Sequence, residues 1–124
     1  MATYKNKIRK EFFAKHSLKD ARGPIEETHE HKWVLETTIE GNKLSESGCL
    51  IDFRDFDKSL DEIIASFQGK NFSNLDFFKN RSASTENIAE YVFFQLKPIM
   101  DKSGVVLTDI TIWEDENHGA TFSL

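Results

Sequence analysis

The feature that most constrains the fold is a strict alternation in residues 29–40, whose sequence is HEHKWVLETTIE. One set of alternate residues holds two histidines and large apolar side chains, whereas the other set is mainly charged, with Val34 as the exception. A period of two residues is that of a β-strand. A strand with one apolar and one charged face is typical of an antiparallel sheet that meets water on one side. The chain is therefore predicted to fold around an antiparallel sheet.

Other segments predict the remaining strands, because apolar residues in them alternate or form short runs. They are bounded by polar or glycine-containing turns, which are typical of strand ends. Strands are predicted at 5–17, ending near His16, at 105–113 and at 119–124, with an additional short buried strand at 49–53 and a loop over 18–28 around Gly23-Pro24.

Two segments change from a strand period to a helical one. Apolar residues between Phe53 and Phe67 recur at the spacing of one helix face, and Gly69 is expected to end this first helix. Residues 70–83, which follow it, are expected to form a polar loop.

The second helix is predicted to begin at Ser84 or Thr85, since either hydroxyl can cap its first turn. Its apolar stripe runs to Met100, and Pro98 late in the pattern should kink or shorten the helix. The predicted order of elements is therefore strand, strand, helix, helix, strand, strand.

These elements predict one α+β domain over residues 1–124: a four-stranded antiparallel sheet with two helices packed on one face. In a monomer the other face has no cover. It carries either Trp33, Leu35 and Ile39 or Val34 with its neighbours, and the pattern leaves both alternatives open. Uncovered faces and open strand edges favour assembly, so a homo-oligomer is expected.

Composition and charge argue against several classes of protein. The net charge is −5, so nucleic acid is not an expected partner. No apolar run approaches the roughly 20 residues that cross a bilayer, and the N-terminus has no signal-peptide pattern. Cys49 is the only cysteine, is expected to be a buried small hydrophobe, and cannot form a disulfide framework. A cytoplasmic protein without membrane contact is expected.

Three histidines form a candidate metal site. His29 and His31 are two residues apart on one strand and therefore point to the same side. If the two N-terminal strands pair antiparallel, His16 lies beside them. Three imidazoles with an open fourth position are typical of catalytic zinc, although imidazole also suits iron, copper and nickel. Spacing alone leaves open the alternative of ordinary strand histidines, and His118 is predicted to be a loop residue.

At these residues the chain resembles the 6-pyruvoyltetrahydropterin synthases and the related 6-carboxytetrahydropterin synthases of queuosine biosynthesis. The likeness covers nearly the whole chain, and the order and spacing of several segments agree together. The matching segments are FFAKHSL (12–18), THEHKW (28–33), GCLIDF (48–53), SASTENIAEY (82–91) and TIWEDE (111–116).

The resemblance implies a zinc-dependent lyase that acts on dihydroneopterin triphosphate or a related pterin. His16, His29 and His31 would hold the zinc. Glu114 would grip the pterin ring, and the hydroxyls of Ser84 and Thr85 would lie beside it. The family fold, called the T-fold or tunnelling fold, forms trimers whose sheets close into a barrel and stack in pairs as hexamers, with sites between subunits.

The sequence departs from the family where protons are handled. Ile25 stands where the family has its catalytic cysteine, and Gln68 and Gly69 stand where it has an Asp-His pair. Glu26 and Glu27 lie close to the cysteine position, and one of them is expected to be the base, since some relatives that cleave the side chain use a glutamate there.

These departures leave three functions open. The first is the lyase, and the second is a non-catalytic relative that binds metal and a pterin or purine. The third is a structural or interaction protein without a ligand, which the intact histidine spacing argues against.

Overall fold

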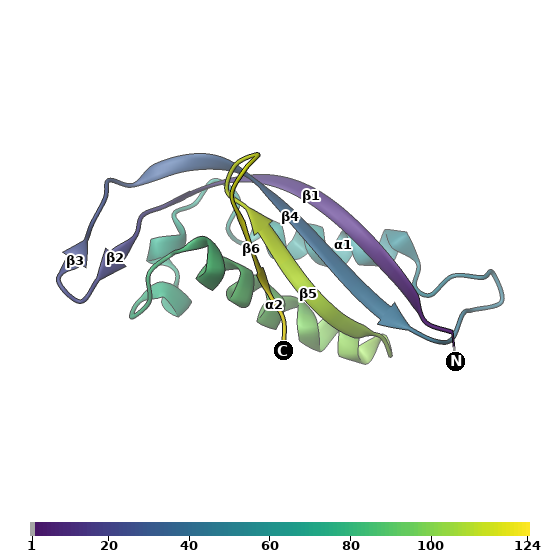
Figure 1. Cartoon of the computed structure of the whole chain (residues 1–124). Coiled ribbons are helices and arrows are strands. Elements are labelled where there is room, and N and C mark those ends of the chain that lie inside the picture. The colour runs from purple at the N-terminus through teal and green to yellow at the C-terminus, as the bar shows by residue number, and fades with distance from the viewer. Residues whose placement is uncertain (1) are drawn as a thin grey trace.

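The computed structural model describes residues 2–124. A long sheet lies against two helices, and a small hairpin extends from one end of it (Figure 1). The elements are β1 (Tyr4–His16), β2 (Lys19–Asp20), β3 (Gly23–Pro24), β4 (His29–Gly41), α1 (Phe53–Ala65), the 3₁₀ turns η1 (Phe72–Asn74) and η2 (Asp76–Phe78), α2 (Thr85–Lys102), β5 (Val106–Trp113) and β6 (Gly119–Phe122).

The main sheet has four antiparallel strands in the order β1-β4-β5-β6. Both helices pack on one face of it (Figure 1). The predicted α+β architecture is therefore confirmed. Strands β1 and β4 pair along their whole length, with His16 opposite His29 and Phe12 opposite Trp33.

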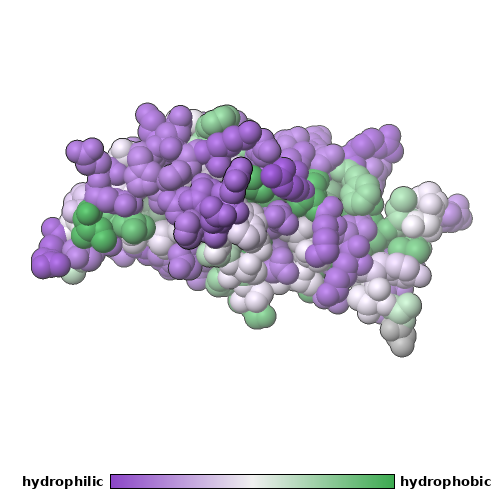
Figure 2. Space-filling model, turned by 45° about the horizontal axis from the view of Figure 1, so that its top comes forward, coloured by the Kyte–Doolittle hydropathy of each residue, from purple (hydrophilic) through white to green (hydrophobic). Residues whose placement is uncertain are grey.

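The apolar face of β4 is the one that the helices cover. Trp33, Leu35 and Ile39 are completely buried there, next to Phe12 of β1. Of the two alternatives, the uncovered face is thus the one with Val34, which lies among charged side chains. The surface seen in Figure 2 is correspondingly mostly hydrophilic, with small apolar patches.

Side-chain caps set the first residue of each helix. The Asp52 carboxylate accepts a hydrogen bond from the backbone N–H of Arg54, and Ser84 accepts one from Asn87. Helix α2 continues past Pro98 to Lys102, so the predicted shortening is wrong. Within residues 2–124, no helix is long and apolar enough to cross a membrane.

The segment from Cys49 to Phe53 corrects two predictions. It forms no strand but a bend that leads into α1, because Asp52 caps that helix and Phe53 is its first residue. Cys49 is exposed rather than buried. The loop over residues 18–28 also has more order than predicted, since β2 and β3 form a short hairpin in which Gly23 adopts a φ of 120°.

An aromatic cluster fills the core below the histidine end of the sheet. Phe72 and Phe78 come from the two 3₁₀ turns and are fully buried, although a polar loop was predicted for this segment. Phe72 packs edge-on against Trp33, with ring centroids 6.1 Å apart, and against Phe12 at 6.2 Å. This cluster of Phe12, Trp33, Phe72 and Phe78 lies beneath the three histidines and is called the aromatic floor below.

Candidate metal centre

The antiparallel register of β1 and β4 brings the three predicted histidines together. His16 and His29 are directly opposed, and His31 faces the same side of the sheet two residues further along β4. The Nε2 atoms of His16 and His29 are 2.9 Å apart. The ring of His31 is 4.6 Å from that of His29 and 5.3 Å from that of His16. The arrangement expected from spacing is thus present.

Trp33 holds the histidines from below. Its ring centroid is 4.8 Å from that of His16 and 5.4 Å from that of His31. Its indole N–H donates to the backbone carbonyl of Ala14, at 3.0 Å, so the ring is fixed in the core. The imidazole of His16 is itself buried, with a relative exposure of 1%.

Backbone carbonyls fix the tautomers of two histidines. The Nδ1 atom of His16 lies 2.7 Å from the carbonyl oxygen of Ala83, and that of His29 lies 2.9 Å from the carbonyl oxygen of Glu27. Because a carbonyl can only accept, each Nδ1 must carry the proton, and a neutral ring then has a lone pair at Nε2. Such carbonyl contacts are typical outer partners of metal-binding histidines.

The resulting donor set fits a divalent cation. Two Nε2 lone pairs that face each other at 2.9 Å cannot hydrogen-bond to each other. The Nε2 atom of His31 is buried and has no partner with hydrogen-bond geometry within the described chain, although a carboxylate oxygen of Glu114 lies 2.9 Å from it. Burial lowers the pKa of His31, which favours its neutral, metal-binding form. Imidazole nitrogens in such a group suit zinc.

Glu114 is expected near the metal as a pterin ligand, and in the structure it lies directly among the histidine nitrogens. It follows the last residue of β5, and its Oε1 atom lies 2.9 Å from Nε2 of His31 and 3.3 Å from Nε2 of His16. The four donor atoms of the histidines and Glu114 all lie within 4.8 Å of one another. The sequence predicted Glu114 only as a pterin ligand. The β4–β5 register would have indicated more, since it pairs Trp113 with Val34 and so brings the next residue, Glu114, to the histidine face.

Thr85 joins the same group, and Ser84 supports it from the backbone. The hydroxyl of Thr85 donates to Oε2 of Glu114 at 3.3 Å. Ser84 caps α2 and follows Ala83, whose carbonyl contacts His16. Thr85 therefore contacts the donor group directly and Ser84 lies next to it, and their role beside a pterin stays a prediction.

Glu26 and Glu27 are exposed and lie outside the group of four donor residues. The carboxylate of Glu26 accepts the backbone N–H of Leu18 at 2.9 Å, which orders the loop before β4. Glu27 contributes its carbonyl to His29. Gln68 accepts the N–H of Phe13, and the N–H of Gly69 donates to the carbonyl of Phe13, so both are committed to the edge of β1.

A cavity of about 610 Å³ opens beside the donor group. Trp113 forms part of its wall, and its indole N–H donates to Glu36 at 2.8 Å. Gly119 makes room for this indole, because a Cβ atom there would lie 2.6 Å from the ring. The remaining lining residues are Arg9, Glu11, His31, Lys32, Val34, Glu114, Asp115 and Glu116.

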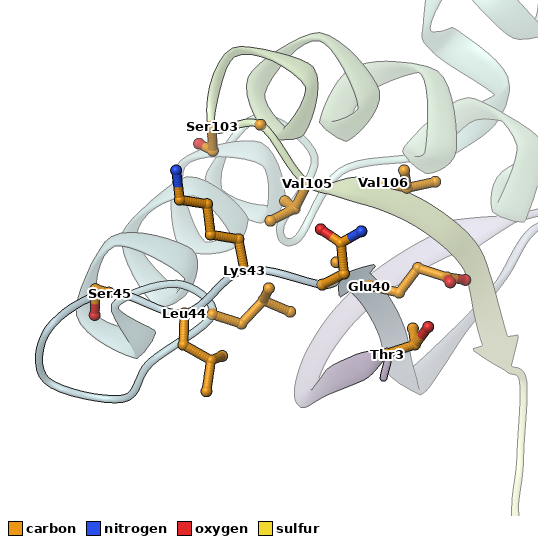
Figure 3. Close-up of a pocket in the computed structure, with 12 residues that line it drawn as sticks. Thr3, Glu40, Lys43, Leu44, Ser45, Ser103, Val105 and Val106 are labelled. Atoms are coloured by element: carbon orange, nitrogen blue, oxygen red, sulfur yellow. The ribbon is translucent and has the colours of Figure 1, made fainter. Parts of the chain in front are cut away.

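A second cavity, of about 600 Å³, lies at the other end of β4 (Figure 3). Its wall includes Gly41, Lys43, Leu50 and Val105. No further group of His, Cys, Asp or Glu with metal-binding spacing was found among residues 2–124. The two cavities therefore differ in chemistry rather than in size.

Comparison with known proteins gives consistent results. Residues 5–124 match the family model described as 6-pyruvoyl tetrahydropterin synthase. A Caenorhabditis elegans protein named "Putative 6-pyruvoyl tetrahydrobiopterin synthase" is 27% identical over 95 residues, which are 76% of this chain and 67% of that protein.

Solved structures show the shared fold. The Caenorhabditis elegans 6-pyruvoyl tetrahydropterin synthase superposes with a TM-score of 0.87 at 22% identity, covering 100% of this chain and 97% of that one. A Plasmodium vivax 6-pyruvoyltetrahydropterin synthase, in a variant with its catalytic-residue glutamate replaced by cysteine, gives 0.77 at 15% identity over 98% of both chains. The four-stranded sheet with two helices is thus the T-fold of these proteins.

Proposed function

The chain belongs to the 6-pyruvoyl tetrahydropterin synthase family, and from this membership we propose that it is a zinc-dependent lyase acting on dihydroneopterin triphosphate or a related pterin. The observation that carries the proposal is the convergence of three histidine Nε2 atoms, two of them with tautomers fixed by backbone carbonyls. A structural protein without a ligand has no need of this group.

In the proposed reaction, His16, His29 and His31 hold the metal. When bound, zinc polarises hydroxyls of the pterin side chain and makes the neighbouring C–H protons easier to remove. Glu114 accepts N–H groups from the edge of the pterin ring, a paired geometry that discriminates strongly among ring systems. The hydroxyls of Ser84 and Thr85 lie at the same end of α2 and complete the ring's surroundings.

The base in this proposal is Glu26 or Glu27. Ile25, in the family's cysteine position, has no group that can take a proton, and it is 60% exposed. The Plasmodium vivax relative has a catalytic glutamate, which supports a carboxylate base in this fold. Departure of the triphosphate would accompany loss of a C–H proton to the base, whereas cleavage of the side chain would require the base to take a proton from a side-chain hydroxyl.

Metal analysis and a turnover assay test the proposal. We expect about one zinc per chain in the purified protein, held by the three-histidine set, and a new product from dihydroneopterin triphosphate. Turnover should fall in Glu26→Gln or in Glu27→Gln and persist in Glu30→Gln, an exposed glutamate on β4. Activity that survives both of the first two substitutions contradicts the base assignment, and absence of zinc contradicts the site.

A second candidate is a non-catalytic relative that binds metal and a pterin. It is favoured by Gln68 and Gly69, which occupy the family's Asp-His positions and are both hydrogen-bonded to Phe13. A ligand-binding measurement separates this candidate from the lyase. Binding of a pterin without product supports it, and if Glu114→Ala binds guanine-type ligands as well as the unmodified protein does, the anchor assignment is wrong.

Assembly into a homo-oligomer, a trimer or hexamer, forms part of the proposal, as does a cytoplasmic location. Strand β1 is 13 residues long and lies at the sheet edge, and residues 68–71 cover only its last part through bonds to Phe13 and Lys15. A long open edge favours pairing with another strand. Light scattering of the purified protein should give a mass several times that of the 14.3 kDa chain.

A further inference from the structure

The carboxylate of Glu114 cannot bind the edge of a pterin ring and remain among the histidine nitrogens at the same time. To grip the edge of a planar ring it must present both oxygens to a pair of N–H groups. In the structure its Oε1 atom instead lies among the histidine Nε2 atoms, at 2.9 Å, 3.3 Å and 3.9 Å from His31, His16 and His29. Its Oε2 atom accepts the hydroxyl of Thr85.

The position of Oε1 is that of a fourth donor to the metal. All four donor atoms lie within 4.8 Å of one another, and the fourth is a carboxylate oxygen, which zinc accepts alongside imidazole. Three protein ligands leave a zinc ion open to substrate, whereas four protein ligands close it.

We propose that Glu114 is the fourth protein ligand of the metal in the substrate-free protein and that pterin binding draws its carboxylate off the metal and onto the ring. The inference rests on the proposed function for its second half only. The resting site is thereby closed to water and to small anions, and the correct ring system opens it.

The surroundings of Glu114 suit such an exchange. Its backbone is fixed, because its N–H donates to the carbonyl of His118 at 2.9 Å across the turn between β5 and β6. Its side chain is 27% exposed and lines the cavity of about 610 Å³. Thr85 is the first residue of α2, where the helix dipole favours a negative charge. The carboxylate therefore moves about a fixed backbone between two favourable positions.

The test compares Glu114→Gln with the unmodified protein, without any pterin. Glu116→Gln is the matched control, because Glu116 lines the same cavity but is not in the donor group. Each protein is loaded with Zn²⁺ for competition against a chelator and with Co²⁺ for visible absorption. In Glu114→Gln we expect zinc affinity to fall by more than roughly tenfold and the Co²⁺ bands to change, because an uncharged amide replaces a ligating carboxylate, whereas Glu116→Gln keeps both properties.

Unchanged affinity and unchanged Co²⁺ bands in Glu114→Gln would overturn the inference. If circular dichroism shows that this variant does not fold, Thr85→Val takes its place. That substitution removes only the hydroxyl that holds Oε2, so zinc affinity should fall about fivefold, as for the loss of one hydrogen bond. Affinity equal to that of the unmodified protein would then overturn the inference.

Adding neopterin to the Co²⁺-loaded unmodified protein tests the exchange itself. A change in the Co²⁺ bands on binding supports it, and binding without any change overturns it. The proposed function fails separately, if no pterin binds although Glu114→Gln has shown the carboxylate to be a ligand. Conversely, if Glu114→Gln loses pterin binding but keeps the Co²⁺ bands, the function stands and the fourth-ligand assignment falls.

Discussion

The two ends of β4 carry cavities of nearly equal volume, about 610 Å³ at the histidine end and about 600 Å³ at the end shown in Figure 3. At the histidine end, four donor atoms converge over a floor of buried aromatic rings. At the other end, the wall is formed by polar groups, backbone and aliphatic side chains that range from the buried Val105 to the exposed Val106. The comparison shows that cavity volume does not identify the metal site. The site is identified by side-chain nitrogen and oxygen atoms that converge with free lone pairs and have no proton to donate to one another.

The first prediction concerns the aromatic floor and has the largest expected effect. Trp33→Ala should lower the free energy of unfolding by about 3–5 kcal/mol, because it opens a cavity in a fully buried cluster. Leu50→Ala at the other end should cost only about 1 kcal/mol, since Leu50 is half-buried. Urea unfolding measures both, and equal losses would remove the contrast in packing between the two ends.

The second prediction concerns the donors. His29→Ala should weaken zinc binding by more than about a hundredfold, because loss of an inner ligand exceeds the effect of losing an outer one. The control is His118→Ala, which removes an exposed histidine paired with Asp115 and should change zinc affinity by less than about twofold. Competition with a chelator gives both values. Similar losses in the two variants would mean that the histidines do not act as a specific group.

The third prediction compares two crowded glycines, one at each end. Gly119→Ala should cost about 1–3 kcal/mol, since the new Cβ would lie 2.6 Å from the rigid indole of Trp113. Gly41→Ala should cost less than about 1 kcal/mol, because the nearest atom, at 2.8 Å, is the movable end of Leu50. Thermal unfolding distinguishes the two, and the reverse order would show that the histidine end is the more adaptable one.

The smallest effect is expected for a polar residue of the second cavity. Lys43→Ala removes an exposed side chain from its wall and should change the free energy of unfolding by less than about 0.5 kcal/mol. Zinc and pterin binding should remain as in the unmodified protein. A clear loss of either ligand would show that the two ends are coupled, which no contact between them suggests.

Much of the fold could be predicted, because local periodicity carries it. The alternation in β4 gives the strand and separates its apolar face from its charged face, although it leaves open which face the helices cover, and the hydroxyl of Ser84 marks the start of α2. The prediction of a strand at residues 49–53 was wrong. The short apolar run after Cys49 looks like a strand, but the capping carboxylate of Asp52 begins a helix inside it, and no period is visible over so few residues.

The site was predictable only in part for a related reason. His16, His29 and His31 lie on β1 and β4, which only the short β2–β3 hairpin separates in the sequence, so their meeting follows from one antiparallel pairing. Glu114 reaches them through the β4–β5 pairing, and its contact with Thr85 depends on how α2 packs on the sheet. The register between segments that are far apart in the sequence cannot be predicted from any one of those segments.

The placement of the tryptophans has a practical consequence. The chain has two, Trp33 below the histidines and Trp113 in the wall of the adjoining cavity, so its tryptophan emission originates at one end of the molecule. A paramagnetic ion such as Cu²⁺ held by His16 would quench the indole only 4.8 Å from that ring, whereas a chromophoric ligand would act first on Trp113. The protein thus contains an optical reporter that can separate the arrival of an ion from the arrival of an organic ring without any added label.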